Sequence, residues 1–202
     1  RDRNRIALQS DLLGFNVFGI RNVLVLTGDD PKAGDQPDTK AVFDLKSNDL
    51  ITTIVGIRDH HKLPAPSERA VDGDLDMFIG AADMPIDPPA DWKPNGLLAK
   101  IAVGAQFAQT QFCMDIDIAK RYFKVLADNG VTEKLKILLG VCPPASGRSA
   151  RWIKENLFGA IIPDSMIDRI EAAEDQRAEG RKVCAEFIQQ VSEVPGVAGV
   201  HI

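Results

Sequence analysis

The chain has 202 residues, of which 45% are hydrophobic and 26% are charged, values that are ordinary for one soluble globular domain. Its formal net charge is −5 and no long run of Lys or Arg occurs, which argues against a surface that binds nucleic acid. No apolar stretch approaches the roughly 18 residues that a membrane-spanning helix needs. We therefore expect a single soluble domain without a nucleic-acid or membrane partner.

Five short apolar runs predict strands. They cover residues 22–27, 76–82, 107–112, 136–141 and 197–202. The first run is nearly all apolar, as expected of a strand that is covered on both faces. The second and the fourth contain Gly80 and Gly140, and the last contains His201.

Amphipathic segments between these runs predict helices. In the first of them, Leu8, Leu12 and Phe15 fall on one helix face, and Gly19 is a suitable end. Further helices are expected to begin at Asp115 or Asp117, at Ser146 or Ser149, at Pro163–Ser165 and near Asp175. Such alternation indicates an α/β fold with a parallel sheet. A doubly wound sheet and a (β/α)8 barrel both fit, although no G-x-G-x-x-G motif supports a dinucleotide-binding sheet.

The cysteines and histidines do not suggest a metal site. Cys113, Cys142 and Cys184 are odd in number and far apart, so we expect reduced thiols in a cytoplasmic protein, with Cys113 and Cys142 as small buried side chains. The adjacent His60 and His61 would point about 100° apart on a helix, a poor arrangement for shared coordination. His201 has no evident co-ligand in the sequence.

Polar residues follow several of the predicted strands, where parallel α/β folds form their sites. Asp29 and Asp30 follow the first strand, and Gln111 ends the third. Each also has an ordinary structural interpretation: the two aspartates as turn residues, Gln111 as a partner for backbone groups, and Lys100 as a solvated helix residue. Taken singly, these residues leave both interpretations open.

Taken together, the segments around these residues resemble the methylenetetrahydrofolate reductase family. The similarity continues in register along the whole chain, so chance agreement is improbable. The segments that carry it are Val23–Pro31 with its Thr-Gly-Asp loop, Phe78–Pro85, Lys100–Phe107 with its Lys-x-x-x-Gly-Ala pattern, Thr110–Phe112 (Thr-Gln-Phe), Gly140–Pro143 and Ile161–Pro163.

The resemblance implies a (β/α)8 TIM barrel, with residues 1–202 as a single flavin-binding catalytic domain. A complete barrel needs about 250 residues, so about five of eight strands are expected here and the first strands are expected to be absent. The implied activity is FAD-dependent reduction of 5,10-methylenetetrahydrofolate to 5-methyltetrahydrofolate in one-carbon and methionine metabolism. NADH or NADPH is the implied electron donor. A homo-oligomer, or completion by further polypeptide, is the implied assembly.

By the same resemblance, Asp29 is the catalytic carboxylate beside the flavin and the folate, where it stabilises a cationic form of the substrate. Thr27 and Gly28 belong to the same cofactor-binding loop. Lys100 matches a lysine near the flavin phosphates. Ala82 and Met84 match positions that line the flavin nucleotide. Gln111 matches the residue that hydrogen-bonds the pterin.

The sequence also departs from the family. An aromatic or large apolar residue is usual in the loop after the fourth strand, where this chain has Ala145–Arg148, and Met84 stands where some members have tyrosine. The family's general-acid glutamate lies on its first strand and is not expected in this chain. A non-catalytic barrel subunit therefore remains an alternative, although it would not need Asp29, Lys100 and Gln111 together. Another barrel enzyme would usually show a glycine-rich phosphate loop, for which Gly196–Gly199 is a poor candidate.

Overall fold

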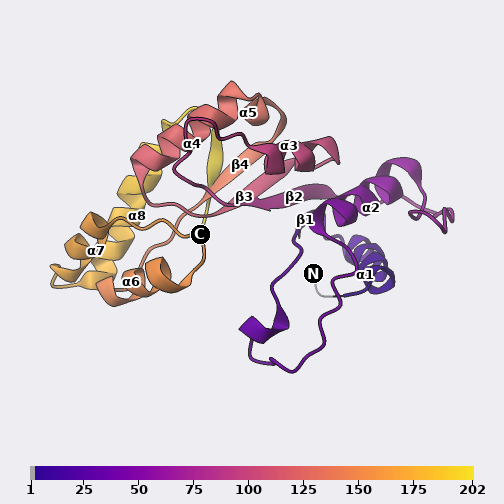
Figure 1. The fold of residues 1–202 in the computed structure, drawn as a ribbon, viewed down its shortest axis with the longest axis horizontal. Coiled ribbons are helices and arrows are strands. Elements are labelled where there is room, and N and C mark those ends of the chain that lie inside the picture. Colours follow the sequence, from indigo (N-terminus) through magenta and orange to yellow (C-terminus); the bar gives the residue numbers. More distant parts are fainter. Residues whose placement is uncertain (1–2) are drawn as a thin grey trace. The chain divides into compact units, whose positions relative to one another are not determined.

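A computed structural model describes residues 3–202. Helices alternate with five strands (Figure 1), and the strands form one parallel sheet in the order β1-β2-β3-β4-β5. Each strand therefore lies beside the next one along the chain, as in successive β–α–β units. The predicted α/β fold with a parallel sheet is confirmed, and the five strands form an open sheet.

The observed elements follow the sequence pattern closely. The strands match the predicted ranges to within two residues at either end: β1 (Asn22–Val25), β2 (Phe78–Asp83), β3 (Phe107–Phe112), β4 (Lys136–Gly140) and β5 (Val197–His201). The helices are α1 (Arg5–Val17), η1 (Pro31–Ala33), α2 (Ser47–His60), α3 (Asn95–Ala102), α4 (Ile116–Asp128), α5 (Val131–Lys134), α6 (Gly147–Asn156), α7 (Asp164–Glu171) and α8 (Gln176–Ser192). Of these, η1 and α5 were not expected from the sequence.

Side chains that were expected to begin helices do so. The Asp115 carboxylate accepts hydrogen bonds from backbone N–H groups at the start of α4, and Ser146 and Asp175 do the same for α6 and α8. Gly19 and Gly130 follow the ends of α1 and α4 with positive φ angles of 76° and 68°, which favour glycine. Among residues 3–202, no helix has the length and apolar character needed to cross a bilayer.

The chain divides into two compact units, Arg1–Ala82 with Leu98–Phe107 and Asp83–Leu97 with Ala108–Ile202. In the first unit, Val23 and Val25 of β1 lie opposite Ile79 and Ala81 of β2. The core of this unit combines these strands with the buried face of α2, which consists of Leu50, Ile51, Thr53, Ile54 and Ile57.

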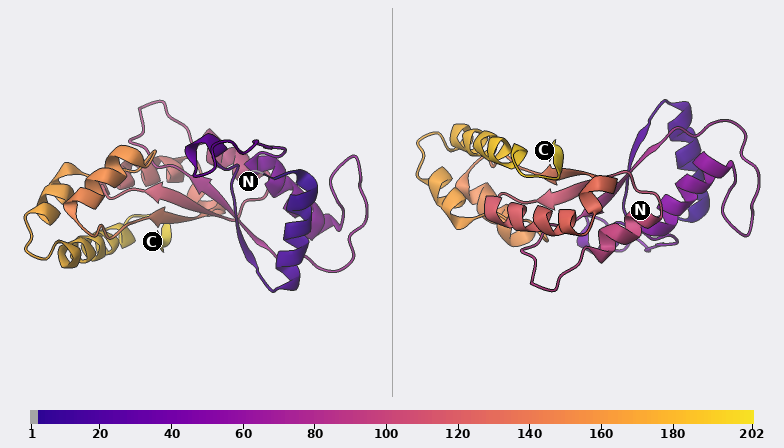
Figure 2. Two further views of the ribbon diagram at one scale, coloured as in Figure 1. Left: turned by 90° about the horizontal axis from the view of Figure 1, so that it is seen from below. Right: turned by 90° about the horizontal axis from the view of Figure 1, so that it is seen from above.

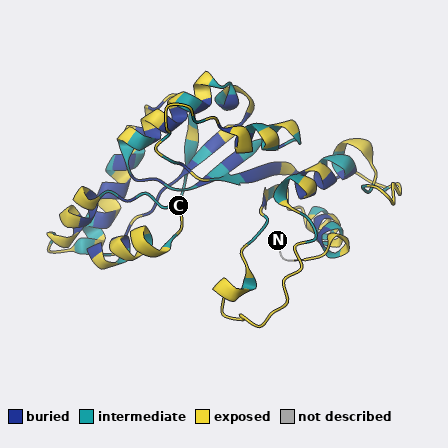
Figure 3. Cartoon of the chain, viewed as in Figure 1, coloured by how far each residue is buried: buried dark blue, intermediate teal, exposed yellow. Residues whose placement is uncertain are grey.

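The second unit has the larger continuous core. Tyr122 and Phe123 of α4 are fully buried, as are Ile137 and Leu139 of β4. Figure 3 colours buried residues dark blue, and along the helices they alternate with exposed residues in yellow. Helix α7 packs between α6 and α8, and the three helices lie together in both views of Figure 2.

Burial alternates along β3, which therefore has one packed face and one accessible face, whereas Ile79, Gly80 and Ala81 of β2 are buried in succession. In β3, Ala108 and Thr110 are buried, whereas Gln109 and Gln111 are only half-buried. In β1, Val25 is buried but Leu24 is 39% exposed. The continuous apolar run of β1 suggested cover on both faces, and this expectation is wrong because the open sheet leaves one face accessible.

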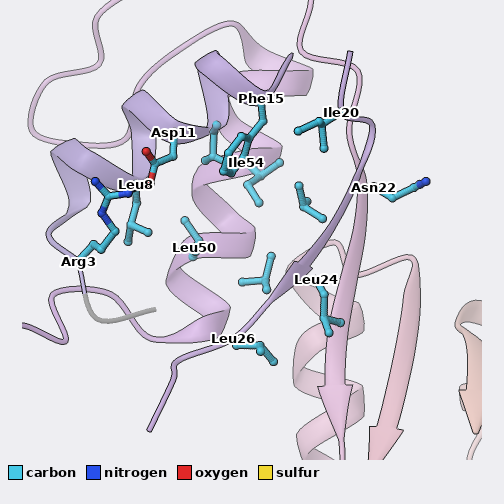
Figure 4. Close-up of a pocket in the computed structure, with 13 residues that line it drawn as sticks. Arg3, Leu8, Asp11, Phe15, Ile20, Asn22, Leu24, Leu26, Leu50 and Ile54 are labelled. Atoms are coloured by element: carbon cyan, nitrogen blue, oxygen red, sulfur yellow. Dashed lines mark hydrogen bonds and ion pairs between the residues drawn. The ribbon is translucent and has the colours of Figure 1, made fainter. Parts of the chain in front are cut away.

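An apolar cavity of about 450 Å³ lies in the first unit between α1, β1 and α2 (Figure 4). Phe15 of α1 and Leu24 of β1 line it and remain exposed, and the Arg3–Asp11 ion pair lies at its side. Strand β1 is at one end of the sheet order, with β2 as its strand neighbour. Half of the backbone groups of a parallel edge strand point away from the sheet.

We expect residues 1–202, expressed alone, to unfold with weak cooperativity or to aggregate, because the β1 edge and its apolar cavity lack cover. Urea unfolding and size-exclusion chromatography would measure this behaviour. Leu24→Lys places a charge beside the edge and should reduce the aggregation. A sharp two-state transition from a monomer would contradict the expectation.

Candidate functional site

Asp29 is exposed in the loop that follows β1. Thr27 Oγ1 accepts a hydrogen bond from the backbone N–H of Ser47 at 3.1 Å, which ties the loop to the start of α2. Gly28 has a φ of 90°, a conformation that favours glycine. Within residues 3–202, the exposed carboxylate of Asp29 makes no hydrogen bond or ion pair. It borders a cavity of about 310 Å³ formed by the loop, and is available to a ligand.

Asp30, in contrast, has a clear structural role. Its Oδ1 accepts a hydrogen bond from the backbone N–H of Lys32 at 3.0 Å and so begins helix η1. The sequence allowed both aspartates to be turn residues, but the capping contact belongs to Asp30. The functional interpretation is therefore stronger for Asp29 than for Asp30.

Two residues predicted to bind the flavin meet at the carboxyl end of β2. Lys100 lies in the last turn of α3, is half-buried, and donates a hydrogen bond from Nζ to the Ala82 carbonyl oxygen. This contact argues against the interpretation of Lys100 as a solvated helix residue. An ammonium group carries three donors, and this bond uses one of them.

Gln111, on the accessible face of β3, links the end of its strand to a distant segment. Its Oε1 accepts a hydrogen bond from the backbone N–H of Phe112 at 2.9 Å, and its Nε2 donates to the carbonyl oxygen of Phe158 at 3.1 Å. The expectation that this amide could satisfy backbone groups at the strand end is confirmed. The hydrogen bonding of Gln111 to the pterin stays a prediction.

The segment after α6 runs beside the end of β3. The Ile161 N–H donates to the Phe112 carbonyl at 2.9 Å, and Ile161 forms a parallel bridge with Cys113. Gly159 has a φ of 78°, and a Cβ atom there would overlap the sulfur of Met84. This Cβ would also lie 3.7 Å from the Gln111 Cγ. Met84 and Gln111, which were predicted separately, thus share a contact at Gly159.

A buried tyrosine anchors the residue before Met84. The hydroxyl of Tyr122, on α4, donates a hydrogen bond to the carboxylate of Asp83. Burial, and then the charge of Asp83, raise the pKa of Tyr122, so its hydroxyl remains a donor. The ring of Trp92 lies 5.8 Å from that of Tyr122, centroid to centroid. Sequence reasoning did not find this group, because its members are far apart in the chain and have common residue types.

Glycine at position 140 permits a contact between strands that are not neighbours. Gly140 lies opposite His201 in the β4–β5 register, and His201 Nε2 lies 2.8 Å from the Thr110 carbonyl oxygen on β3. Thr110 Oγ1 in turn accepts a hydrogen bond from the Gly140 N–H at 3.0 Å. His201, which the sequence left without a partner, therefore helps to fix the end of β3.

The cysteines behave as small buried side chains. All three are free and buried, and burial was predicted for Cys113 and Cys142. Burial raises the pKa of the Cys113 thiol to about 11 and that of Cys142 to about 12, so both stay protonated at neutral pH. Neither thiol is suited to act as a nucleophile.

Comparison with known families agrees with this arrangement. The sequence model of one family, described as Methylenetetrahydrofolate reductase, matches residues 1–202, which is the whole chain. No curated protein matches the chain. The family consists of oxidoreductases whose TIM barrel generally binds FAD, and the alternating helices and parallel strands fit that fold. The chain belongs to the methylenetetrahydrofolate reductase family.

Proposed function

We propose that this chain uses FAD to reduce 5,10-methylenetetrahydrofolate to 5-methyltetrahydrofolate, with NADH or NADPH as the electron donor, in one-carbon and methionine metabolism. The observation that carries the proposal is the family match over residues 1–202, within which Asp29, Lys100 and Gln111 are all present. FAD, when bound, supplies the hydride chemistry, and the protein supplies binding, orientation and charge.

The residues at the end of β2 fit a flavin with its phosphates. Lys100 is already held at this strand end through Ala82, and the donors that this bond leaves free suit an anionic oxygen. Gly28 adds a backbone position without a side chain in the loop before Asp29. In this proposal Thr27, Gly28, Ala82, Met84 and Lys100 contact the cofactor.

Asp29 and Gln111 have separate roles toward the folate. The carboxylate of Asp29 stabilises positive charge that develops on the folate nitrogen. The amide of Gln111 both donates and accepts hydrogen bonds, which matches the edge of a pterin ring. Binding the pterin in this way exchanges the contacts that Gln111 makes with Phe112 and Phe158 in the free protein.

A direct test begins with the colour of the purified protein. A flavoprotein shows visible flavin absorbance, and its reduced form is reoxidised without oxygen when methylenetetrahydrofolate is added. A colourless protein that cannot be loaded with FAD would instead support the non-catalytic barrel subunit. Homo-oligomerisation, or completion by further polypeptide, belongs to the proposal, as does a cytoplasmic location, which the three free cysteines support.

Lys100→Ala should weaken FAD binding by about tenfold, because one charge-assisted contact is lost. Equilibrium titration of the apoprotein with FAD would measure the change. Lys120, an exposed lysine on α4, provides the matched control, and Lys120→Ala should bind FAD normally. Unchanged affinity in a folded Lys100→Ala protein would show that Lys100 does not contact the flavin.

Gln111→Ala should slow reoxidation of the reduced enzyme by methylenetetrahydrofolate and largely spare reduction by the nicotinamide. The reason is that its amide pairs with the pterin only when that substrate is bound. Stopped-flow absorbance separates the two half-reactions. Gln109→Ala removes an amide from the same face of β3, two residues earlier, and should affect neither. Equal damage to both half-reactions in Gln111→Ala would argue against a role specific to the pterin.

A further inference from the structure

Phe158 presents an aromatic ring to solvent from a constrained position. Its side chain is 84% exposed, although it lies in a short turn between α6 and the segment that pairs with β3. The Ala160 N–H closes this turn on the Leu157 carbonyl at 3.0 Å. An isolated exposed Phe is common on protein surfaces, so exposure alone carries no functional meaning.

The position of Phe158 is what distinguishes it. Its own carbonyl oxygen accepts the hydrogen bond from Gln111 Nε2, so the backbone of Phe158 is tied to the residue that we propose binds the pterin. The next residue, Gly159, packs against Met84. Two residues later, Ile161 is held to the end of β3. Three contacts therefore fix the turn beside candidate binding residues from two strands.

We infer that Phe158 is a further substrate-binding residue, whose ring packs on the planar bicyclic ring of the folate beside Gln111. This inference rests on the proposed function. Gln111 offers hydrogen bonds to the edge of such a ring, whereas Phe158 offers an apolar surface to its face, and flat polar heterocycles need both. Met84, which is 37% exposed, adds a polarisable thioether that lies against Gly159.

The hydrogen bond between Gln111 and Phe158 has a second consequence for binding. In the free protein the Gln111 Nε2 restrains the Phe158 carbonyl, and a pterin that takes over this donor removes that one restraint, while the contacts of Gly159 and Ile161 keep the turn beside β3. The ring of Phe158 is then free to settle on the ligand that removed the restraint. Recognition at the edge of the ring and contact with its face are thereby coupled through one hydrogen bond.

The test uses the FAD-loaded holoenzyme and a ligand that does not accept hydride, 5-methyltetrahydrofolate. Its dissociation constant would be measured by anaerobic calorimetry with the flavin kept reduced, because a reduced flavin cannot take hydride back from this ligand and the readout therefore does not depend on turnover. Phe158→Ala should weaken binding by about five- to tenfold, as expected for loss of an aromatic packing contact. Phe158→Tyr keeps the ring and should bind within about twofold of the unaltered protein.

Phe18 provides a matched control. It is also 84% exposed, but it follows α1 at the opposite end of β1 from the Asp29 loop. Phe18→Ala should leave the dissociation constant unchanged. If Phe158→Ala loses flavin, Phe158→Leu replaces it, because leucine keeps apolar bulk without the ring and the same weakening is expected.

The outcomes separate this inference from the proposed function. If the unaltered holoenzyme reduces methylenetetrahydrofolate but Phe158→Ala, or Phe158→Leu in its place, binds 5-methyltetrahydrofolate normally, Phe158 has no binding role and the proposed function stands. If the unaltered protein holds no flavin and binds no folate, the proposed function fails and the inference fails with it. Weakened binding in both Phe158→Ala and Phe158→Tyr would also overturn it, because the ring itself would then not be the contact.

Discussion

Asp29→Asn is expected to lower the rate of folate reduction by about 10²–10³-fold, equivalent to roughly 3–4 kcal/mol of transition-state stabilisation. The substitution keeps the size of the side chain and removes its charge. Positive charge on the folate nitrogen is greater in the transition state than in the bound substrate, so a fixed carboxylate there lowers the barrier as well as aiding binding. Single-turnover reoxidation of the reduced enzyme by methylenetetrahydrofolate would measure the loss.

The structure supplies the control for this experiment. Asp30 is the neighbouring carboxylate, and its contact with the Lys32 N–H can be made equally well by an asparagine. Asp30→Asn should therefore keep near-normal folate reduction. Similar damage from both substitutions would mean that Asp29 only shapes the turn.

A second readout follows from the same charge. A carboxylate disfavours the gain of electrons by a group bound beside it, so Asp29→Asn should raise the reduction potential of the bound flavin. FAD affinity should change little, because the cation proposed to hold the phosphates is Lys100. Normal folate turnover together with an unshifted potential would show that the electrostatic role is wrong.

The sequence predicted the positions of the strands well because each strand is a short apolar run between turn residues. In β4, for example, Ile137 and Leu139 are fully buried on one face, and the observed strand begins at the predicted residue. The first residues of helices were equally predictable, because a capping residue such as Asp115 bonds only to residues that follow it directly. Local patterns of this kind do not require knowledge of distant contacts.

The contacts of the candidate site depend on distant residues and were harder to foresee. Gln111 was singled out by resemblance, but its partner Phe158 is 47 positions away along the chain and stands in no recognisable motif. Likewise, nothing in the local pattern connects Asp83 with Tyr122, which belong to β2 and α4. Helix and strand periodicity shows that Tyr122 is buried, whereas the position of its hydroxyl requires the structure.

Gly140→Ala is expected to lower the free energy of unfolding by about 1–3 kcal/mol, because the added methyl group has no room. A Cβ atom at this position would lie 2.6 Å from the Thr110 carbonyl oxygen and 2.8 Å from that of Gln111. Both are backbone atoms of the adjoining strand, so neither can move aside as a flexible side chain could. Strands β3 and β4 would have to separate locally.

This separation should also impair the site. The end of β3 is held by the Gly140 N–H through Thr110 Oγ1, and by His201, which reaches the Thr110 carbonyl across the glycine. A methyl group at position 140 displaces both contacts, and Gln111 is the next residue along β3. We therefore expect slower reoxidation by methylenetetrahydrofolate in addition to the loss of stability.

Gly14→Ala is the matched control for the stability measurement. Gly14 lies within α1, and a Cβ atom there would meet nothing within 4 Å. The same chemical change should therefore be neutral, or stabilising by up to about 1 kcal/mol through helix propensity. Urea unfolding of the two variants compares a crowded glycine with an open one. If Gly140→Ala unfolds at the same urea concentration as the unaltered protein and reduces folate at the same rate, β3 and β4 accommodate the methyl group, and the fixed position of Gln111 does not depend on this glycine.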